Sequence, residues 1–265
     1  MDKPLTVPGL LALKAQGTKI AALTAYDAGF AAAMDEAGVD LVLVGDSLGM
    51  VVQGHASTLP VTLEQMIYHA ACAARGVRRA VLAADLPFMS YADVGQALSS
   101  AARLVREAGV QMVKLEGGRK RESVVRALVD EDIPVCAHLG LMPQSIHRTG
   151  GYLVQGRDER SAQLILEDAL ILQEAGASLL VLECVPAALA SEITASLSIP
   201  TIGIGAGAGC DGQVLVCYDL LGLTPGQRPK FSKNFLEGAG DIRAAFRRYA
   251  AEVRAGTFPG PEHGY

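Results

Sequence analysis

Short apolar runs recur along the chain, and five of them end in an acidic or basic side chain. The clearest run covers residues 39–44, is rich in Val and Leu, and is followed at once by Gly45, Asp46 and Ser47. Runs of this length are too short for helices and are typical of buried strands in a parallel sheet. Comparable runs lead to Asp85, Glu116, His138 and Glu183. We expect these side chains to converge on one pocket at the carboxyl ends of the strands.

The apolar runs alternate with longer segments of helical character. The expected strands are residues 19–24, 39–44, 80–84, 111–115, 134–137, 179–182, 201–204 and 214–216. The expected helices are residues 27–37, 62–75, 93–108, 122–132, 161–175 and 186–197. Such β/α alternation indicates parallel pairing, in a closed barrel or an open doubly wound sheet. The count of eight strands favours an α/β fold of the (β/α)8 TIM barrel type.

Two parts of the pattern are less regular. Only about ten residues separate the last two strands, too few for a full crossover helix, so we expect a truncated seventh helix. A long loop is expected over residues 139–158, and a short helix over residues 5–16. No domain boundary or repeat is visible, which predicts one barrel domain over residues 1–265.

Residues 225–265 form an extension beyond the eighth expected strand. Within it, apolar side chains recur at helical spacing, which predicts an amphipathic helix over residues 241–254. These side chains are Ile242, Ala245, Phe246, Tyr249, Ala250 and Val253. Such a helix can cover its own barrel or dock on a neighbouring subunit, and the pattern does not choose between them.

The composition is that of a metabolic enzyme. Half of the 265 residues are hydrophobic, 19% are charged, and the net charge is −5 without a Lys/Arg block, which argues against nucleic-acid binding. No apolar run reaches the roughly 18 residues of a membrane span, and no secretory signal is visible. The five cysteines form no CxxC pair and indicate buried, reduced thiols. We therefore expect a soluble, cytoplasmic protein.

Three of the predicted strand ends carry carboxylates that suggest a metal site. Asp46, Asp85 and Glu116 would face one another across the barrel mouth and repel unless a cation lies between them. Oxygen ligands suit Mg²⁺, whereas zinc prefers His or Cys at spacings that are absent here. Lys114 lies two residues before Glu116 on the same strand face, where it could bind a substrate carboxylate.

Each of these residues alone also has a purely structural interpretation. Asp46 and Asp85 precede turns and could bond only to the backbone. Lys114 and Glu116 could be simple ion-pair partners, and His138 could be a satisfied buried histidine. Glu183 ends a strongly apolar strand, where an unpaired carboxylate is costly, which favours a functional role. The coincidence of five such residues at five consecutive strands favours a shared site.

A glycine-rich segment, residues 203–212, contains a GxGxxG match at Gly207, Gly209 and Gly212. A dinucleotide-binding fingerprint must open a helix, but an apolar strand follows here. We therefore interpret the segment as a tight turn packed against the floor of the pocket.

Several motifs together resemble those of the ketopantoate hydroxymethyltransferase family. The resemblance covers nearly the whole chain. It is carried by residues 45–54 (GDSLGMVVQG), 61–69 (VTLEQMIYH), 84–88 (ADLPF), 113–118 (VKLEGG), 138–145 (HLGLMPQS), 202–207 (IGIGAG) and 229–231 (PKF).

The resemblance implies a Mg²⁺-dependent barrel of the phosphoenolpyruvate/isocitrate-lyase-like superfamily, assembled as a homodecamer (a pentamer of dimers). It implies that Asp46, Asp85 and Glu116 form the metal site, with Glu116 acting through water. It also implies that the ketoacid is bound by Asp46, Ser47, Asp85, Lys114 and His138. Glu183 matches the residue assigned as the general base, whereas the role of His138 beyond the pocket stays open.

The activity implied by the resemblance belongs to pantothenate and coenzyme A biosynthesis. A hydroxymethyl group passes from 5,10-methylenetetrahydrofolate to 3-methyl-2-oxobutanoate through a Mg-stabilised enolate, which gives 2-dehydropantoate. Two alternatives are a Mg-dependent 2-oxoacid C–C lyase of the same superfamily and a non-catalytic ketoacid-binding barrel. The Lys-Lys-Cys-Gly-like loop expected of the lyases is absent from the sequence.

Overall fold

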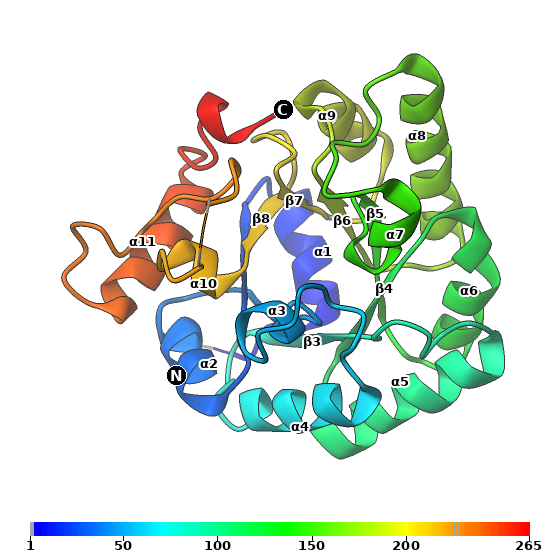
Figure 1. The fold of residues 1–265 in the computed structure, drawn as a ribbon, viewed down its shortest axis with the longest axis horizontal. Coiled ribbons are helices and arrows are strands. Elements are labelled where there is room, and N and C mark those ends of the chain that lie inside the picture. The colour runs from blue at the N-terminus through cyan, green and yellow to red at the C-terminus, as the bar shows by residue number, and fades with distance from the viewer. Residues whose placement is uncertain (1–2, 225, 227) are drawn as a thin grey trace.

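The computed structural model describes residues 3–224, 226 and 228–265, and these residues form a closed barrel of parallel strands (Figure 1). The strands pair in chain order, and β1 closes the barrel by pairing with β8. They are β1 (Ile20–Thr24), β2 (Leu41–Val44), β3 (Val81–Asp85), β4 (Met112–Glu116), β5 (Val135–Gly140), β6 (Leu179–Glu183), β7 (Thr201–Ile204) and β8 (Gly212–Leu215). The predicted (β/α)8 barrel is confirmed.

Helices surround the barrel and connect its strands. The long ones are α2 (Ala28–Glu36), α4 (Leu63–Ala74), α5 (Val94–Ala108), α6 (Glu122–Asp130), α8 (Glu159–Glu174), α9 (Ala187–Ser196) and α11 (Ile242–Arg254). Polar N-caps begin several of them: Asp27, Thr62, Asp93, Asp158 and Asp241 each accept a hydrogen bond from a backbone N–H of the first turn. These caps fix where each crossover helix starts, and therefore how long each loop at the carboxyl ends of the strands can be.

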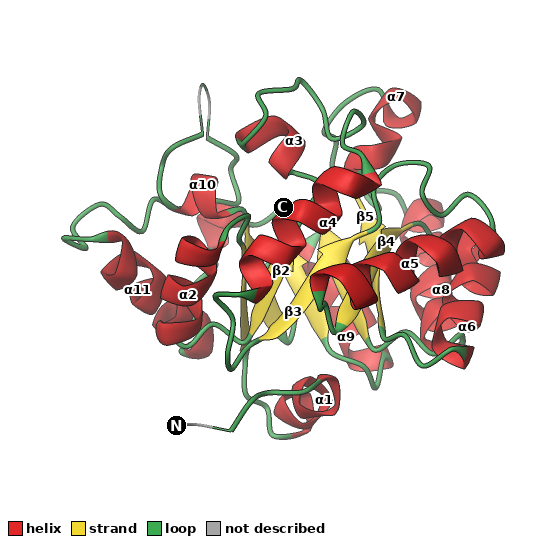
Figure 2. Cartoon of the chain, turned by 90° about the horizontal axis from the view of Figure 1, so that it is seen from below, coloured by secondary structure: helices red, strands yellow, loops and turns green. Residues whose placement is uncertain are grey.

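Alternating strand residues divide the core into two parts. One set points into the barrel, including Ile20, Leu41 and Val81, while the other packs beneath the outer helices. Helix α1 (Val7–Ala15), which precedes β1, closes the amino-terminal end of the barrel, where its Leu10 joins the inward-pointing set. Figure 2 shows α1 at one end of the barrel and the short helices α3 and α7 at the opposite end. The latter end, formed by the carboxyl ends of the strands, is left for function.

Three connections differ from the sequence-based expectation. No helix, not even a truncated one, connects β7 to β8: residues 205–211 form a loop, and β8 begins at Gly212, two residues earlier than predicted. The segment over residues 139–158 is not a simple loop, because it contains the 3₁₀ turn η2 (Pro143–Ser145) and the helix α7 (Ile146–Thr149). A further short helix, α3 (Leu48–Val51), follows β2. The second and third of these connections lie at the functional end of the barrel, whereas residues 205–211 run from that end of β7 to the amino-terminal end of β8, where Asp211 pairs with Lys14 of α1.

Helix α11 packs on its own barrel, beside α2 and β1. Its Phe246 and Tyr249 are fully buried, and the Tyr249 hydroxyl lies 2.9 Å from the carbonyl oxygens of both Ala22 and Gln213. Between β8 and α11 lie the short helix α10 (Cys217–Leu220) and an irregular segment, and the 3₁₀ turn η3 (Pro261–His263) follows α11. Among the described residues no helix is long and apolar enough to cross a membrane.

The five cysteines offer a test of the packing. Cys136, Cys184, Cys210 and Cys217 are buried, and burial raises the pKa of the Cys210 thiol to about 11 and those of the other three to about 12. Cys72 on α4 is only partly buried. Because the thiolate is the reactive form, we predict that Ellman's reagent at pH 8 labels one thiol rapidly in the native protein and all five after unfolding. Rapid labelling that persists in Cys72→Ser would contradict the packing.

Candidate active site

The barrel brings every predicted site residue to one cavity at the carboxyl ends of the strands. The cavity has a volume of about 670 Å³. Strand register fixes the arrangement, because Asp85 lies beside Lys114 and Glu116 lies beside His138 on neighbouring strands. The residues lining the cavity include Asp46, Ser47, Asp85, Lys114, Glu116, His138 and Glu183. The predicted convergence of these side chains is therefore observed.

The deepest part of the cavity is built around Asp85, which ends β3. Its Oδ1 accepts a hydrogen bond from Lys114 Nζ at 2.7 Å, and its Oδ2 accepts one from the backbone N–H of Asp46 at 3.0 Å. Gly45 leaves room for the Ser47 side chain, since a Cβ atom at position 45 would lie 2.8 Å from Ser47 Oγ. Ser47 Oγ also lies 2.9 Å from the hydroxyl of Tyr26. The sequence therefore places Asp46 and Ser47 by a turn that rests on Asp85.

Negative charge dominates this buried end. Burial, and then the charges of Asp85 and Glu116, raise the pKa of Asp46 well above its ordinary value. Burial opposes the charge of Lys114, but the carboxylates of Asp85, Glu116 and Asp46 outweigh it and raise the pKa of the ammonium group. Lys114 is thus held charged, and it does not by itself balance the surrounding acids.

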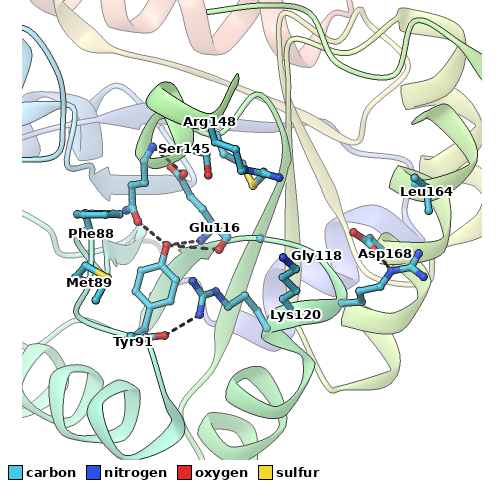
Figure 3. Close-up of a pocket in the computed structure, with 16 residues that line it drawn as sticks. Phe88, Met89, Tyr91, Glu116, Gly118, Lys120, Ser145, Arg148, Leu164 and Asp168 are labelled. Carbon is cyan, nitrogen blue, oxygen red and sulfur yellow. Dashed lines mark hydrogen bonds and ion pairs between the residues drawn. The ribbon is translucent and has the colours of Figure 1, made fainter. Parts of the chain in front are cut away.

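Gln144 links Asp46 to Glu116, and the sequence analysis did not identify it as a site residue. Its Nε2 donates to Asp46 Oδ2 at 2.9 Å, and its backbone N–H donates to Glu116 Oε2 at 3.0 Å. The hydroxyl of Tyr91 donates in turn to Gln144 Oε1 and lies 3.3 Å from the backbone nitrogen of Glu116. Figure 3 shows Tyr91 and Glu116 at the edge of a second cavity of about 430 Å³, outside the barrel. Gln144 belongs to the segment 138–145 that carried the family resemblance, so that motif held the signal.

His138 lies between two carboxylates. Its Nδ1 is 3.6 Å from Glu116 Oε1, and its Nε2 is 3.2 Å from Glu183 Oε2, yet neither contact has the geometry of a hydrogen bond. Burial and Lys114 oppose its charge, but Glu116 and Glu183 outweigh them and raise the pKa of His138 to about 9. The imidazole is therefore charged at neutral pH and has two buried nitrogens available to a ligand.

The donor set fits a divalent cation of the Mg²⁺ type. Four carboxylates line the cavity (Asp46, Asp85, Glu116 and Glu183), and only Lys114 and His138 offset them from the strands. Oxygen donors in excess of nearby cations are the environment that Mg²⁺ prefers. In the described part of the chain no group of three such side chains is already placed as metal ligands. Lys114, Gln144 and the Asp46 N–H donate to carboxylate oxygens of Asp85, Asp46 and Glu116.

The opposite rim of the cavity consists of residues to which the sequence analysis gave no role, although Lys230 and Phe231 belong to the motif at residues 229–231. From the extension beyond β8 come Arg228, Lys230, Phe231 and Tyr265, and from the β5–α8 connection comes Tyr152. Two further positions of the extension, Pro225 and Gln227, lie outside the described residues. Part of the predicted extension over residues 225–265 thus belongs to the wall of the site.

The fold has well-matched solved counterparts. The structure titled 2,3-dimethylmalate lyase, a PEP mutase/isocitrate lyase superfamily member, matches with a TM-score of 0.59 at 18% identity, covering 83% of this chain and 84% of that chain. Phosphonopyruvate hydrolase, in complex with oxalate and Mg²⁺, matches with a TM-score of 0.62 at 13% identity, covering 98% of this chain and 93% of that chain. The chain is therefore a (β/α)8 barrel with the fold of the PEP mutase/isocitrate lyase superfamily.

Sequence comparison narrows this class to one family. The model of the family described as ketopantoate hydroxymethyltransferase matches residues 4–261. A 3-methyl-2-oxobutanoate hydroxymethyltransferase of Methylococcus capsulatus is 58% identical over 265 residues, which is all of this chain and 98% of the relative. The chain belongs to the ketopantoate hydroxymethyltransferase family.

The Gln144 link can be tested by substitution. In Gln144→Leu, Asp46 loses its amide donor and the Tyr91 hydroxyl loses its acceptor, so Asp46 loses its fixed orientation. The backbone N–H of residue 144 still donates to Glu116. Loss of groups that orient ligands typically costs about 10–100-fold in metal affinity, and we predict a shift of this size in the Mg²⁺ concentration that half-activates turnover. Gln163→Leu, which changes a glutamine on the exposed face of α8, is the matched control. An unchanged Mg²⁺ dependence in Gln144→Leu would contradict the role of the link.

Proposed function

We propose that this chain transfers a hydroxymethyl group from 5,10-methylenetetrahydrofolate to 3-methyl-2-oxobutanoate. One water is consumed, and the products are 2-dehydropantoate and tetrahydrofolate, which places the reaction in pantothenate biosynthesis. The family match over residues 4–261 carries the proposal. The cavity supports it. Its acids would hold a cation and Lys114 carries a positive charge, and the carboxylate and keto oxygen of a small 2-oxoacid need both.

Ligand binding is assigned to the deep end of the cavity. Lys114 supplies a fixed positive charge for the substrate carboxylate, and the Ser47 hydroxyl, held by Tyr26, supplies a hydrogen bond. A divalent cation held by Asp46 and Asp85, and by Glu116 through water, would polarise the keto group as a Lewis acid. Gln144 keeps Asp46 and Glu116 in place for that cation.

Proton removal from C3 is assigned to Glu183. It ends β6 on the same cavity, with Oε2 3.2 Å from His138 Nε2. The His138 ring beside it orients the carboxylate towards the cavity. After C3 is deprotonated, its electron pair forms the new C–C bond to the one-carbon unit. The two C–N bonds that hold this carbon to the folate break, the consumed water supplies the new hydroxyl group, and the C3 proton and the second proton of the water end on the folate nitrogens. His138 is therefore a positioning group beside the base in this scheme.

An assay of turnover distinguishes the proposed transfer from the two alternative functions, a superfamily lyase and a ketoacid-binding barrel. Turnover of a 2-oxoacid without folate would indicate the lyase, and absence of any turnover would indicate the binding barrel. Solved relatives named as lyases and hydrolases are below 20% identical and share only the fold. From the resemblance we further expect a cytoplasmic homodecamer.

The assignment of Glu183 predicts a specific loss. Wild-type protein with Mg²⁺ and no folate should exchange the C3 proton of 3-methyl-2-oxobutanoate with D₂O, as followed by NMR. Because Gln cannot accept the proton, Glu183→Gln should slow this exchange by about 10²–10⁴-fold. The ketoacid should still bind, as measured by calorimetry, because its carboxylate contacts are unchanged.

A matched control is Glu174→Gln, which makes the same change at an exposed position at the end of α8. Its exchange rate should equal that of the wild type. Full exchange in Glu183→Gln would show that another group is the base. Absence of exchange in the wild type, with Mg²⁺ present, would contradict the enolisation step itself.

A further inference from the structure

The active-site cavity is much larger than the ketoacid requires. Its volume is about 670 Å³, and the acidic residues assigned to the ketoacid occupy only the end formed by β2–β6. The rest is lined by segments beyond β7, including Arg228, Lys230, Phe231 and Tyr265. In the proposed reaction the one-carbon unit must bond to C3 of the ketoacid, so the folate has to share this cavity. The unassigned end is the space available to it.

Two aromatic rings form the wall of that end. Tyr265 Cε2 and Phe231 Cδ1 both pack on the glycine loop after β7, lying 3.0 Å and 3.1 Å from the position of a Cβ atom at Gly205. Gly205 has a φ of +63°, so a side chain there would both strain the backbone and displace the rings. At Gly205 the glycine-rich segment thus exposes backbone without a side chain, and two aromatic rings pack on it.

Tyr265 is held in place through its backbone and through its ring. Its backbone carbonyl accepts a hydrogen bond from Ala187 N–H at 2.9 Å, at the start of α9, where Figure 1 shows this end of the chain. Lys230 Nζ donates to the carbonyl of Gly264 at 2.5 Å and lies 4.9 Å from the centroid of the Tyr265 ring. A ring fixed in this way loses little conformational entropy when a ligand stacks on it.

The same end of the cavity is basic. Arg228 and Lys230 line it and are exposed, and neither forms an ion pair with a carboxylate in the described part of the chain. The cavity is therefore polarised, with acids at the deep end and an aromatic wall with unpaired cations at the rim. A ligand that matches the rim has planar rings and carries carboxylates at its outer end.

We propose that the rim residues form the folate subsite: Tyr265 and Phe231 stack on its ring system, and Arg228 and Lys230 bind its glutamate carboxylates. This inference rests on the proposed hydroxymethyl transfer, and it makes Tyr265 a specificity-determining residue for the co-substrate. The acidic end and its Lys114 remain the ketoacid site. Substitutions at the rim should therefore separate folate use from ketoacid use.

The first test replaces the stacking ring. Base–aromatic stacking lost by substitution is large enough to raise the KM for 5,10-methylenetetrahydrofolate about tenfold in Tyr265→Ala. The KM for the ketoacid and the folate-free deuterium exchange at C3 should match the wild type. Tyr265→Phe keeps the ring and should behave as the wild type. Tyr68→Ala, at an exposed tyrosine of α4 outside the cavity, is the matched control.

The second test replaces Arg228, the rim cation that does not contact the Tyr265 ring. Arg228→Met should raise the KM for a methylenetetrahydrofolate with a polyglutamate tail several-fold, but leave the KM for an analogue lacking glutamate unchanged. The difference should shrink at high salt, because exposed charges are screened. Arg106→Met on α5 removes an exposed arginine outside the cavity and should change neither constant.

The outcomes distinguish this inference from the proposed function. If Tyr265→Ala slows folate-free exchange as much as transfer, Tyr265 shapes the ketoacid site and the inference is wrong. Unchanged folate KM values in both Tyr265→Ala and Arg228→Met would also overturn it. If Tyr265→Ala does not fold, Tyr265→Leu keeps apolar bulk and serves for the same comparison. Absence of both exchange and transfer in the wild type would instead refute the function on which the inference rests.

Discussion

The burial of several carboxylates at one edge of the barrel is the constraint on which the site depends. Parallel register makes alternate residues of neighbouring strands point inward, so Asp85, Glu116 and Glu183 reach the same cavity together with Asp46. Their repulsion is offset by Lys114 and His138 and by the hydrogen bonds of Gln144, but acids remain in excess. In the proposed function a divalent cation would complete the balance, and the same balance would suit a substrate that carries keto and carboxylate oxygens.

The amino-terminal end of the barrel contributes packing, whereas the carboxyl end holds the candidate active site. At the amino-terminal end, α1 inserts Leu10 into the inward-pointing core, and the outer wall is sealed by α11 through Phe246 and Tyr249. At the carboxyl end, irregular segments replace regular helices between β5 and α8 and between β7 and β8. The first of these segments brings Gln144 to the acids, and Gly205 of the second packs against Phe231 and Tyr265, which come from the extension beyond β8 and line the opposite rim. The strands thus supply the acidic residues at the deep end of the cavity, and the loops form the rest of its wall.

Much of this was predictable from the sequence, because strands and their ends follow simple rules. Apolar runs of strand length gave the barrel, and the polar residue ending each run pointed to the shared cavity, as Asp85 and Glu116 illustrate. Contacts across loops follow no such period, so the Gln144–Tyr91 link and the approach of Tyr265 to Gly205 could not be read from spacing. The expected seventh helix was wrong for a related reason: a glycine-rich turn joins β7 to β8 within residues 205–211.

The need of the buried acids for a divalent cation is tested most directly by metal binding without substrate. Mn²⁺ can replace Mg²⁺ among oxygen ligands and is observed by electron paramagnetic resonance. A titration should show one Mn²⁺ bound per chain, displaced by excess Mg²⁺ and strongly weakened in Asp46→Asn, which keeps the size of the side chain but removes its charge. Binding that is absent in the wild type, or unaffected by Asp46→Asn, would contradict a cation site at these carboxylates.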